Sequence, residues 1–187
     1  MIPNRRAATN AAVAWWGALR PDPERRQPGD RAALARLRRC ANIAAAMGDP
    51  ATIALFRQVG ATEPHDLPTV ALAAAVLAHL REDRRGTPVA RAVGPTNPDA
   101  PETAVMSPLR FRRLLEAATP DERLIAFRRL VALAGGALDA RDLAAALLDW
   151  SERRRRDWIY AYWNAGAPAG PPTPETAATP AEGTAAA

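Results

Sequence analysis

Arginine dominates the polar chemistry available to this chain. Every one of its 25 lysine or arginine positions holds arginine, and the formal net charge is +5. Guanidinium groups fork onto phosphate oxygens and keep their charge throughout the physiological pH range. A GC-rich coding sequence would also enrich alanine, arginine and proline, but such a bias scatters arginine along the chain. Grouping of the arginines is therefore the feature that indicates a binding surface.

The arginines are in fact grouped. Four clusters stand out: Arg36/Arg38/Arg39, Arg110/Arg112/Arg113, Arg128/Arg129 and Arg153 to Arg156. A single cluster of this kind usually marks a solvated helix face. Four clusters on separate helices favour a shared basic exterior, which would attract a phosphate backbone without reading base sequence. Four consecutive positions go right round a helix, so part of the last run is expected to pair with Asp149, Glu152 or Asp157 instead.

Other reactive side chains offer little chemistry. His65 and His79 are the only histidines, and neither has a partner at metal-ligand spacing. Cys40 lies among arginines that could lower a thiol pKa, but a small packing residue is the favoured interpretation. No phosphate-binding loop, dinucleotide fingerprint or catalytic triad is present. The sequence therefore predicts a protein that is not an enzyme and that has no cofactor and no metal site.

Five tryptophans could either stack on nucleic-acid bases or pack between helices: Trp15, Trp16, Trp150, Trp158 and Trp163. Near the end of the helical region, Trp158 pairs with Tyr162 and Ile159 with Trp163 at the i, i+4 spacing of one helix face. This spacing favours packing against other helices over base stacking.

The best-defined arginines belong to a helical hairpin at residues 107–135. Ser107 and Pro108 are typical of a helix start, and Thr119 with Glu122 forms a capping-box pattern for the second helix. The apolar positions of each helix share one face. They are Phe111, Leu114, Leu115 and Ala118 in the first helix and Leu124, Phe127, Leu130, Val131 and Ala134 in the second. Five arginines lie off these faces, and Gly135-Gly136 ends the hairpin.

The rest of the chain also follows helical patterns. Helices are expected from Asn4 or Thr9 to residue 19, at 31–47, 51–59 and 67–80, and from residue 139 to about 150 with a continuation or bend into 151–163. The helix at 67–80 is apolar on most sides and should be central. Residues 81–106 read as a long irregular, mobile connection with a short helix at 89–93. No alternating pattern predicts a strand.

These patterns predict an all-α fold, a compact bundle of about seven to nine helices in one domain at residues 1–165. Residues 166–187 form a Pro/Ala/Thr-rich tail without arginine, which is expected to be disordered. Its two glutamates mask charge, so the remainder of the chain carries +7. No signal peptide or membrane-spanning run is apparent, and a single cysteine suits the reducing cytoplasm.

Four blocks of sequence resemble the CasB family, the small subunit of the type I-E CRISPR Cascade complex. They are WWGAL at residues 15–19, DRAALARLRRC at 30–40, MSPLRFRRLLEA at 106–117 and LIAFRRLVAL at 124–133. The later segment LAAALLDWSERRRRDWIYAYW at residues 143–163 fits the same family. The resemblance spans residues 13–163 in order, and SPLRFRRLL is its most specific part.

The resemblance implies an all-helical, non-catalytic subunit. In such complexes two copies assemble with the CasA, CasC, CasD and CasE subunits and a guide RNA. They brace the guide–target heteroduplex and hold the displaced DNA strand, which stabilises the R-loop. Carried over to this chain, the nucleic-acid-binding residues are first Arg110, Arg112, Arg113, Arg128 and Arg129, and then Arg36, Arg38 and Arg39. A helix-turn-helix regulator and a purely structural helical adaptor remain the alternatives.

Overall fold

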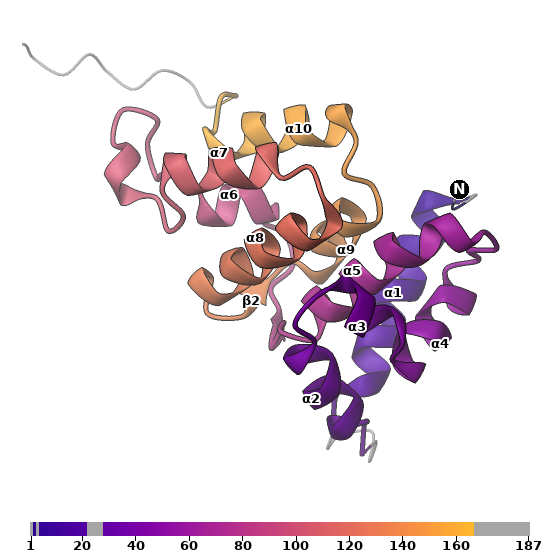
Figure 1. Cartoon of the computed structure of the whole chain (residues 1–187). Helices are drawn as coiled ribbons and strands as arrows, with labels where there is room; N and C mark the ends of the chain where they lie inside the picture. The colour runs from indigo at the N-terminus through magenta and orange to yellow at the C-terminus, as the bar shows by residue number, and fades with distance from the viewer. Residues whose placement is uncertain (1, 3, 22–27, 167–187) are drawn as a thin grey trace, which may run out of the picture.

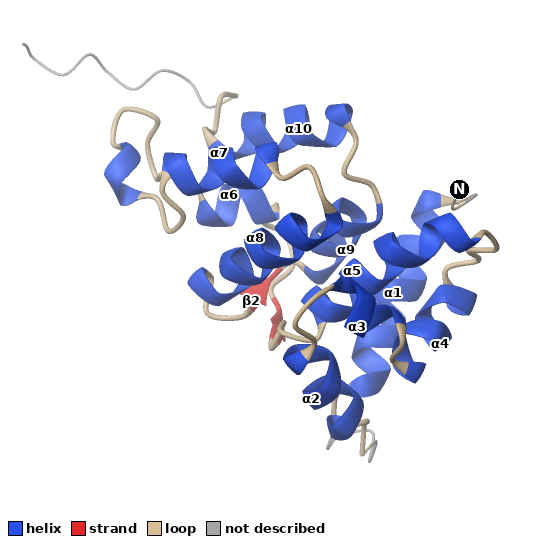
Figure 2. Ribbon diagram, in the orientation of Figure 1, coloured by secondary structure: helices blue, strands red, loops and turns tan. Residues whose placement is uncertain are grey.

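The computed structural model describes residues 2, 4–21 and 28–166, and within them the chain folds into ten α-helices (Figures 1 and 2). The expected all-α class is confirmed. The helix number exceeds the expected seven to nine by one, because one predicted helix is divided in two. The predicted disordered tail lies outside the described residues except for Gly166.

Helix α5 (Leu67–Leu77) forms the centre of the fold, as its apolar sequence predicts. Each of its residues from Val70 to Leu77 is buried, and α1, α3, α4, α8 and α9 pack around it (Figure 1). The helix ends three residues before the predicted position. His79 and Leu80 instead form tight turns, with their amides donating to Val76 and Leu77.

Helices α1 (Arg5–Leu19) and α4 (Pro50–Gln58) pack together beside α5. Asn4 caps α1, which decides between the two predicted starts in favour of Asn4. Trp15 and Trp16 are buried, and their indole nitrogens donate to the carbonyls of Ala51 and Leu80 at 3.1 and 3.3 Å. These tryptophans therefore hold α1 against α4 and the end of α5, as the packing interpretation predicted.

The prediction of a single helix at residues 31–47 is wrong. The segment forms α2 (Arg31–Arg39) and α3 (Ile43–Met47), separated by a break at residues 40–42. Asn42 caps α3, and the Ile43 amide donates to the carboxylate of Asp121 at 2.7 Å. Because these contacts satisfy the backbone groups that a helix end leaves open, the break costs little. It turns Ile43 and Ala46 inward and leaves the predicted core residues Ala41 and Ala44 exposed.

Two very short strands were not predicted. Strands β1 (Glu82–Asp83) and β2 (Ala137–Leu138) pair in parallel, with Glu82 opposite Ala137 and Asp83 opposite Leu138. The connection at residues 81–106 is thus more structured than expected. It contains β1, the predicted short helix as α6 (Val89–Val93), and a single 3-10 turn (Pro101–Thr103). Helix α6 packs against α10, and the Met106 amide donates to Val93.

The predicted hairpin forms as α7 (Pro108–Glu116) and α8 (Pro120–Leu133). The capping box at Thr119 and Glu122 is present, whereas the Ser107 side chain makes no capping hydrogen bond. The apolar positions of both helices face the core, apart from Ala118, which lies beyond α7 and is exposed. Gly135 and Gly136 follow α8 with φ angles of 67° and 79°, a left-handed conformation that favours glycine.

The C-terminal region bends, as one of the two predicted alternatives required. Asp139 caps the N-terminus of α9 (Ala140–Leu148), and Ser151 caps the N-terminus of α10 (Glu152–Tyr162). Trp150 lies between α9 and α10, and Trp158 lies within α10. Their rings pack edge-on against each other and against Phe127 of α8, with ring centroids 5.0 to 5.8 Å apart. The aromatic residues of this region therefore join α10 to the hairpin.

Candidate nucleic-acid interface

The three predicted arginines of α7 are exposed. The side chains of Arg110, Arg112 and Arg113 make no hydrogen bond or ion pair with any described residue. Two buried residues between and beside them anchor the helix. Phe111 stacks on Tyr162 of α10 with ring centroids 3.9 Å apart, and Leu114 is fully buried. The side chains that hold α7 in place thus differ from the side chains that it presents outward.

The two predicted arginines of α8 have different environments. Arg129 is exposed and makes no polar contact with a described residue. Arg128 is half-buried, and its two terminal nitrogens donate to the carbonyls of Cys40 and Leu37 at 2.7 and 3.0 Å. Those carbonyls belong to the C-terminal end of α2, where a positive charge is favoured by the helix dipole. Arg128 therefore joins α8 to α2.

The three predicted arginines of α2 are also divided. Arg36 forms an ion pair of 2.9 Å with the buried carboxylate of Asp49, and Arg38 donates through Nε to the carbonyl of Ala78 at 2.6 Å. The side chain of Arg39 is exposed and makes no ion pair or hydrogen bond with a described residue. Of the eight predicted residues, the exposed set without such contacts is Arg39, Arg110, Arg112, Arg113 and Arg129. We call these five residues the free arginines.

Two titratable side chains, His79 and Cys40, lie at the junction of α2, α5 and α8, near Arg38 and Arg128. Burial, with the charges of Arg128 and Arg38, lowers the pKa of His79 to about 4, so this histidine is neutral at pH 7. Burial raises the pKa of the Cys40 thiol, and its Sγ lies 3.4 Å from the carbonyl of Arg36. Both residues behave as packed side chains, which agrees with their predicted roles.

The run from Arg153 to Arg156 pairs differently from the expectation. Arg154 lies 3.8 Å from the Asp142 carboxylate, and Arg155 donates to the carbonyl of Leu115. Asp149, one of the expected partners, instead binds Arg5 at 2.6 Å. The bend between α9 and α10 explains the difference, because it brings the start of α10 beside α9 rather than continuing one helix.

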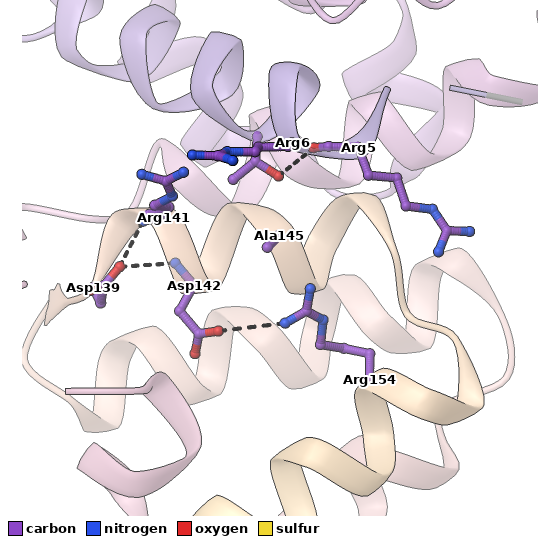
Figure 3. A pocket seen from close by; sticks show the side chains of 8 residues that line it. Arg5, Arg6, Asp139, Arg141, Asp142, Ala145 and Arg154 are labelled. Atoms are coloured by element: carbon purple, nitrogen blue, oxygen red, sulfur yellow. Dashed lines mark hydrogen bonds and ion pairs between the residues drawn. The ribbon is translucent and has the colours of Figure 1, made fainter. Parts of the chain in front are cut away.

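A second concentration of arginines was missed by the sequence reasoning. Arg5 and Arg6 of α1, Arg141 of α9 and Arg154 of α10 line one cavity of about 420 Å³ (Figure 3). Asp139 and Asp142 lie on its α9 side (Figure 3). The adjacent pair Arg5-Arg6 was the only local signal for this site. The other two arginines lie more than 130 positions away in the chain, so only the fold brings them together.

An apolar groove runs between α7 and α10. The groove has a volume of about 380 Å³. Its lining residues come from α7, from α10 and from the position after α10: Pro108, Leu109, Phe111, Arg112, Leu115, Ile159 and Trp163. Two of these residues are exposed, Leu109 by 48% and Ile159 by 41%. Large apolar side chains exposed together are typical of a surface that contacts a partner.

Within the described ranges, no group of three or more histidine, cysteine, aspartate or glutamate side chains could hold a metal ion. In the same part of the chain, no helix has the length and apolarity required to cross a bilayer.

Comparison with known proteins gives one match, to a protein-family model. The family model for the CRISPR-associated protein Cse2 matches residues 33–163, from the start of α2 to the end of α10. No curated protein and no solved structure matches significantly. Because the family model covers well over half of the sequence, this chain belongs to the Cse2 family, the CasB subunits of the type I-E CRISPR Cascade complex.

Proposed function

We propose that this Cascade subunit stabilises the R-loop by contacting nucleic-acid phosphates through its free arginines. It acts without catalysis, by bracing the guide–target heteroduplex and holding the displaced strand. Base pairing with the guide RNA reads the target sequence, so the protein needs only backbone contacts. Its proposed partners are the guide RNA, the target DNA, the CasA, CasC, CasD and CasE subunits, and a second copy of the same chain.

The observation that carries this proposal is the state of the α7 arginines. Arg110, Arg112 and Arg113 are exposed and make no polar contact with a described residue, while Phe111 and Leu114 fix the helix that bears them. A guanidinium without an intramolecular partner has all of its donors available for a phosphate. A fixed helix also reduces the entropy lost when that contact forms.

The engaged arginines have a supporting role in the proposal. Arg36, Arg38 and Arg128 already bind a carboxylate or backbone carbonyls of their own chain. They add to the positive field that attracts a polyanion, but a direct phosphate contact would have to replace existing hydrogen bonds. We therefore assign direct contacts to the free arginines, and to Arg128 the task of holding α2 against α8.

A structural adaptor is the second candidate, and the apolar groove between α7 and α10 favours it. Leu109 and Ile159 are exposed there, which suits contact with a neighbouring subunit. The two functions are compatible, because Arg112 lines the groove while its neighbours Arg110 and Arg113 do not. What distinguishes an adaptor from the proposed function is whether the chain binds nucleic acid at all.

Binding of the full chain to two duplexes of unrelated sequence, followed by fluorescence anisotropy across a salt series, tests the proposal. We expect weak binding of equal strength to both duplexes. Arg112→Ala/Arg113→Ala should reduce the slope of log affinity against log salt by about 1.8, because each lost phosphate contact removes about 0.9. Arg57→Glu is the control, since it removes the same net charge from an exposed α4 residue without a polar contact to the described chain.

Three outcomes would contradict the proposal. Absence of binding at low salt would favour the adaptor, and a preference for one duplex would favour a sequence-reading regulator. An equal salt slope for Arg112→Ala/Arg113→Ala and Arg57→Glu would show that α7 makes no specific phosphate contact.

A further inference from the structure

Two hollows adjoin along one side of α1. The first has a volume of about 420 Å³ and the second about 360 Å³, and both are lined by Asp139 and Arg141. The first extends past Arg5, Arg6 and Thr9, and the second past Asn10, Val13 and Ala14 of the same helix. Together they form a groove between α1 and the N-terminal end of α9, which we call the α1–α9 groove.

Five arginines line the α1–α9 groove. Three of them are in ion pairs, which join Arg5 to Asp149, Arg85 to Asp83 and Arg154 to Asp142. The other two, Arg6 and Arg141, are exposed and make no side-chain hydrogen bond or ion pair with a described residue. In Figure 3 their side chains extend to the same end of the first hollow. Three aspartates, Asp83, Asp139 and Asp142, also line the groove, which leaves it with an excess of positive charge and two guanidiniums outside any ion pair.

The carboxylates in the groove are already used by the backbone. Asp139 accepts hydrogen bonds from the amides of Arg141 and Asp142 through one oxygen and from the Gly86 amide through the other. Asp142 accepts from the Val89 amide, and burial raises its pKa. These acids cap α9 and fix the loop before α6. Neither acid forms an ion pair with the side chain of Arg6 or Arg141, so both guanidiniums remain available to an external anion.

We propose that the α1–α9 groove binds the phosphodiester backbone of a single nucleic-acid strand, separately from the α7 surface. A row of guanidiniums along a groove fits a chain of phosphates better than it fits one small anion. Because the two hollows have volumes of only about 420 and 360 Å³, a single strand suits them better than a duplex does. Val13 and Ala14 provide an apolar wall beside the arginines, which suits the sugars. The inference rests on the proposed function for the class of ligand, but on different residues.

The test uses the full chain and fluorescein-labelled single strands of twenty thymidines, or twenty uridines to compare DNA with RNA. Arg6→Ala/Arg141→Ala should reduce the salt slope by about 1.4, at about 0.7 for each single-strand phosphate contact. If the electrostatic contribution vanishes near 1 M salt, this change corresponds to a roughly 25-fold loss of affinity at 0.1 M salt. Arg6→Lys/Arg141→Lys keeps both charges and should retain most of the slope.

Arg57→Glu, which removes the same net charge elsewhere, is the matched control. If Arg6→Ala/Arg141→Ala binds both strands as Arg57→Glu does, the proposal is overturned, and the groove is better suited to an acidic surface of another subunit. Arg112→Ala/Arg113→Ala is measured in parallel. A loss of single-strand binding only in the groove variant would support the groove, whereas a loss only in the α7 variant would contradict it. The α7 interface is judged separately, by the salt slope of Arg112→Ala/Arg113→Ala on duplexes.

Discussion

The tetrapeptide Phe-Arg-Arg-Leu occurs twice in this chain, at residues 111–114 and 127–130, and its arginines have different uses in the two places. Both phenylalanines and both leucines are buried. In α7 both arginines are exposed without a polar contact to the described chain, whereas in α8 the first arginine is half-buried against the end of α2. Identical local sequence therefore supports two roles.

The neighbours of each copy account for the difference. Helix α8 lies beside the C-terminal end of α2, whose open carbonyls offer acceptors to Arg128. Helix α7 has the open groove with α10 beside it, and no described residue accepts a hydrogen bond from its arginine side chains. The tetrapeptide determines which side chains face outward from each helix. The adjacent element determines whether an outward arginine stabilises the fold or stays available to a ligand.

The largest expected change in the free energy of unfolding comes from replacing the two phenylalanines, and it should differ between them. Phe127→Ala should lower the free energy of unfolding by about 4 kcal/mol, because Phe127 is fully buried between Trp150 and Trp158. Phe111→Ala should cost about 3 kcal/mol, because Phe111 lines the open groove and its site can relax. Urea denaturation measures both. A larger loss for Phe111→Ala would reverse this order and the account of the two packing sites.

The next effect concerns Arg128. Arg128→Ala removes two hydrogen bonds to the end of α2 and should lower the free energy of unfolding by about 2 to 3 kcal/mol. Arg128→Lys should recover only part of this loss, since an ammonium lacks the planar fork that binds both carbonyls. The neighbouring exposed residue supplies the control, and Arg129→Ala should leave stability nearly unchanged. Equal losses at both positions would contradict the structural role of Arg128.

His79 gives a pH test of the same junction. Its pKa is lowered to about 4 in the fold, against about 6.5 in the unfolded chain, so the unfolded chain binds more protons between these values. This residue should therefore destabilise the fold as pH falls from 6.5 to 4, by about 1 to 2 kcal/mol after allowance for its partial exposure. The difference between wild type and His79→Gln in urea denaturation isolates this contribution. A difference that does not change with pH would exclude it.

The smallest effect on stability is expected for the α7 arginines. Arg112→Ala/Arg113→Ala should change the free energy of unfolding by no more than about 0.5 kcal/mol, because neither side chain has a polar contact with a described residue. Thermal and urea denaturation of this variant beside Arg128→Ala provide the check. A loss comparable to that of Arg128→Ala would remove the contrast between the two copies of the tetrapeptide.

Much of the fold was predictable because its signals are local. The capping box at Thr119, the glycine stop after α8 and the apolar composition of α5 each involve residues close together in sequence. The exposed α7 arginines followed from the same helical periodicity. These features depend on backbone geometry that any amphipathic helix shares.

The features that were missed depend on distant residues. The break between α2 and α3 is stabilised by Asp121 and Arg128, some 80 to 90 positions away. Strands β1 and β2 have two residues each and pair over more than 50 positions, so no alternating pattern could indicate them. The α1–α9 groove likewise combines Arg5 and Arg6 with Arg141 and Arg154. Tertiary contacts decided each of these features.

The central claim is that the exposed Phe-Arg-Arg-Leu arginines act on nucleic acid, whereas Arg128, the half-buried arginine of the second copy, maintains the fold. The most direct test measures R-loop lifetime in the assembled type I-E complex that contains Arg112→Ala/Arg113→Ala, with Arg57→Glu as the charge-matched control. The account predicts that the α7 variant assembles normally, keeps wild-type stability and shortens the R-loop lifetime well beyond the control. An R-loop lifetime equal to that of the control, in a fully assembled complex, would contradict it.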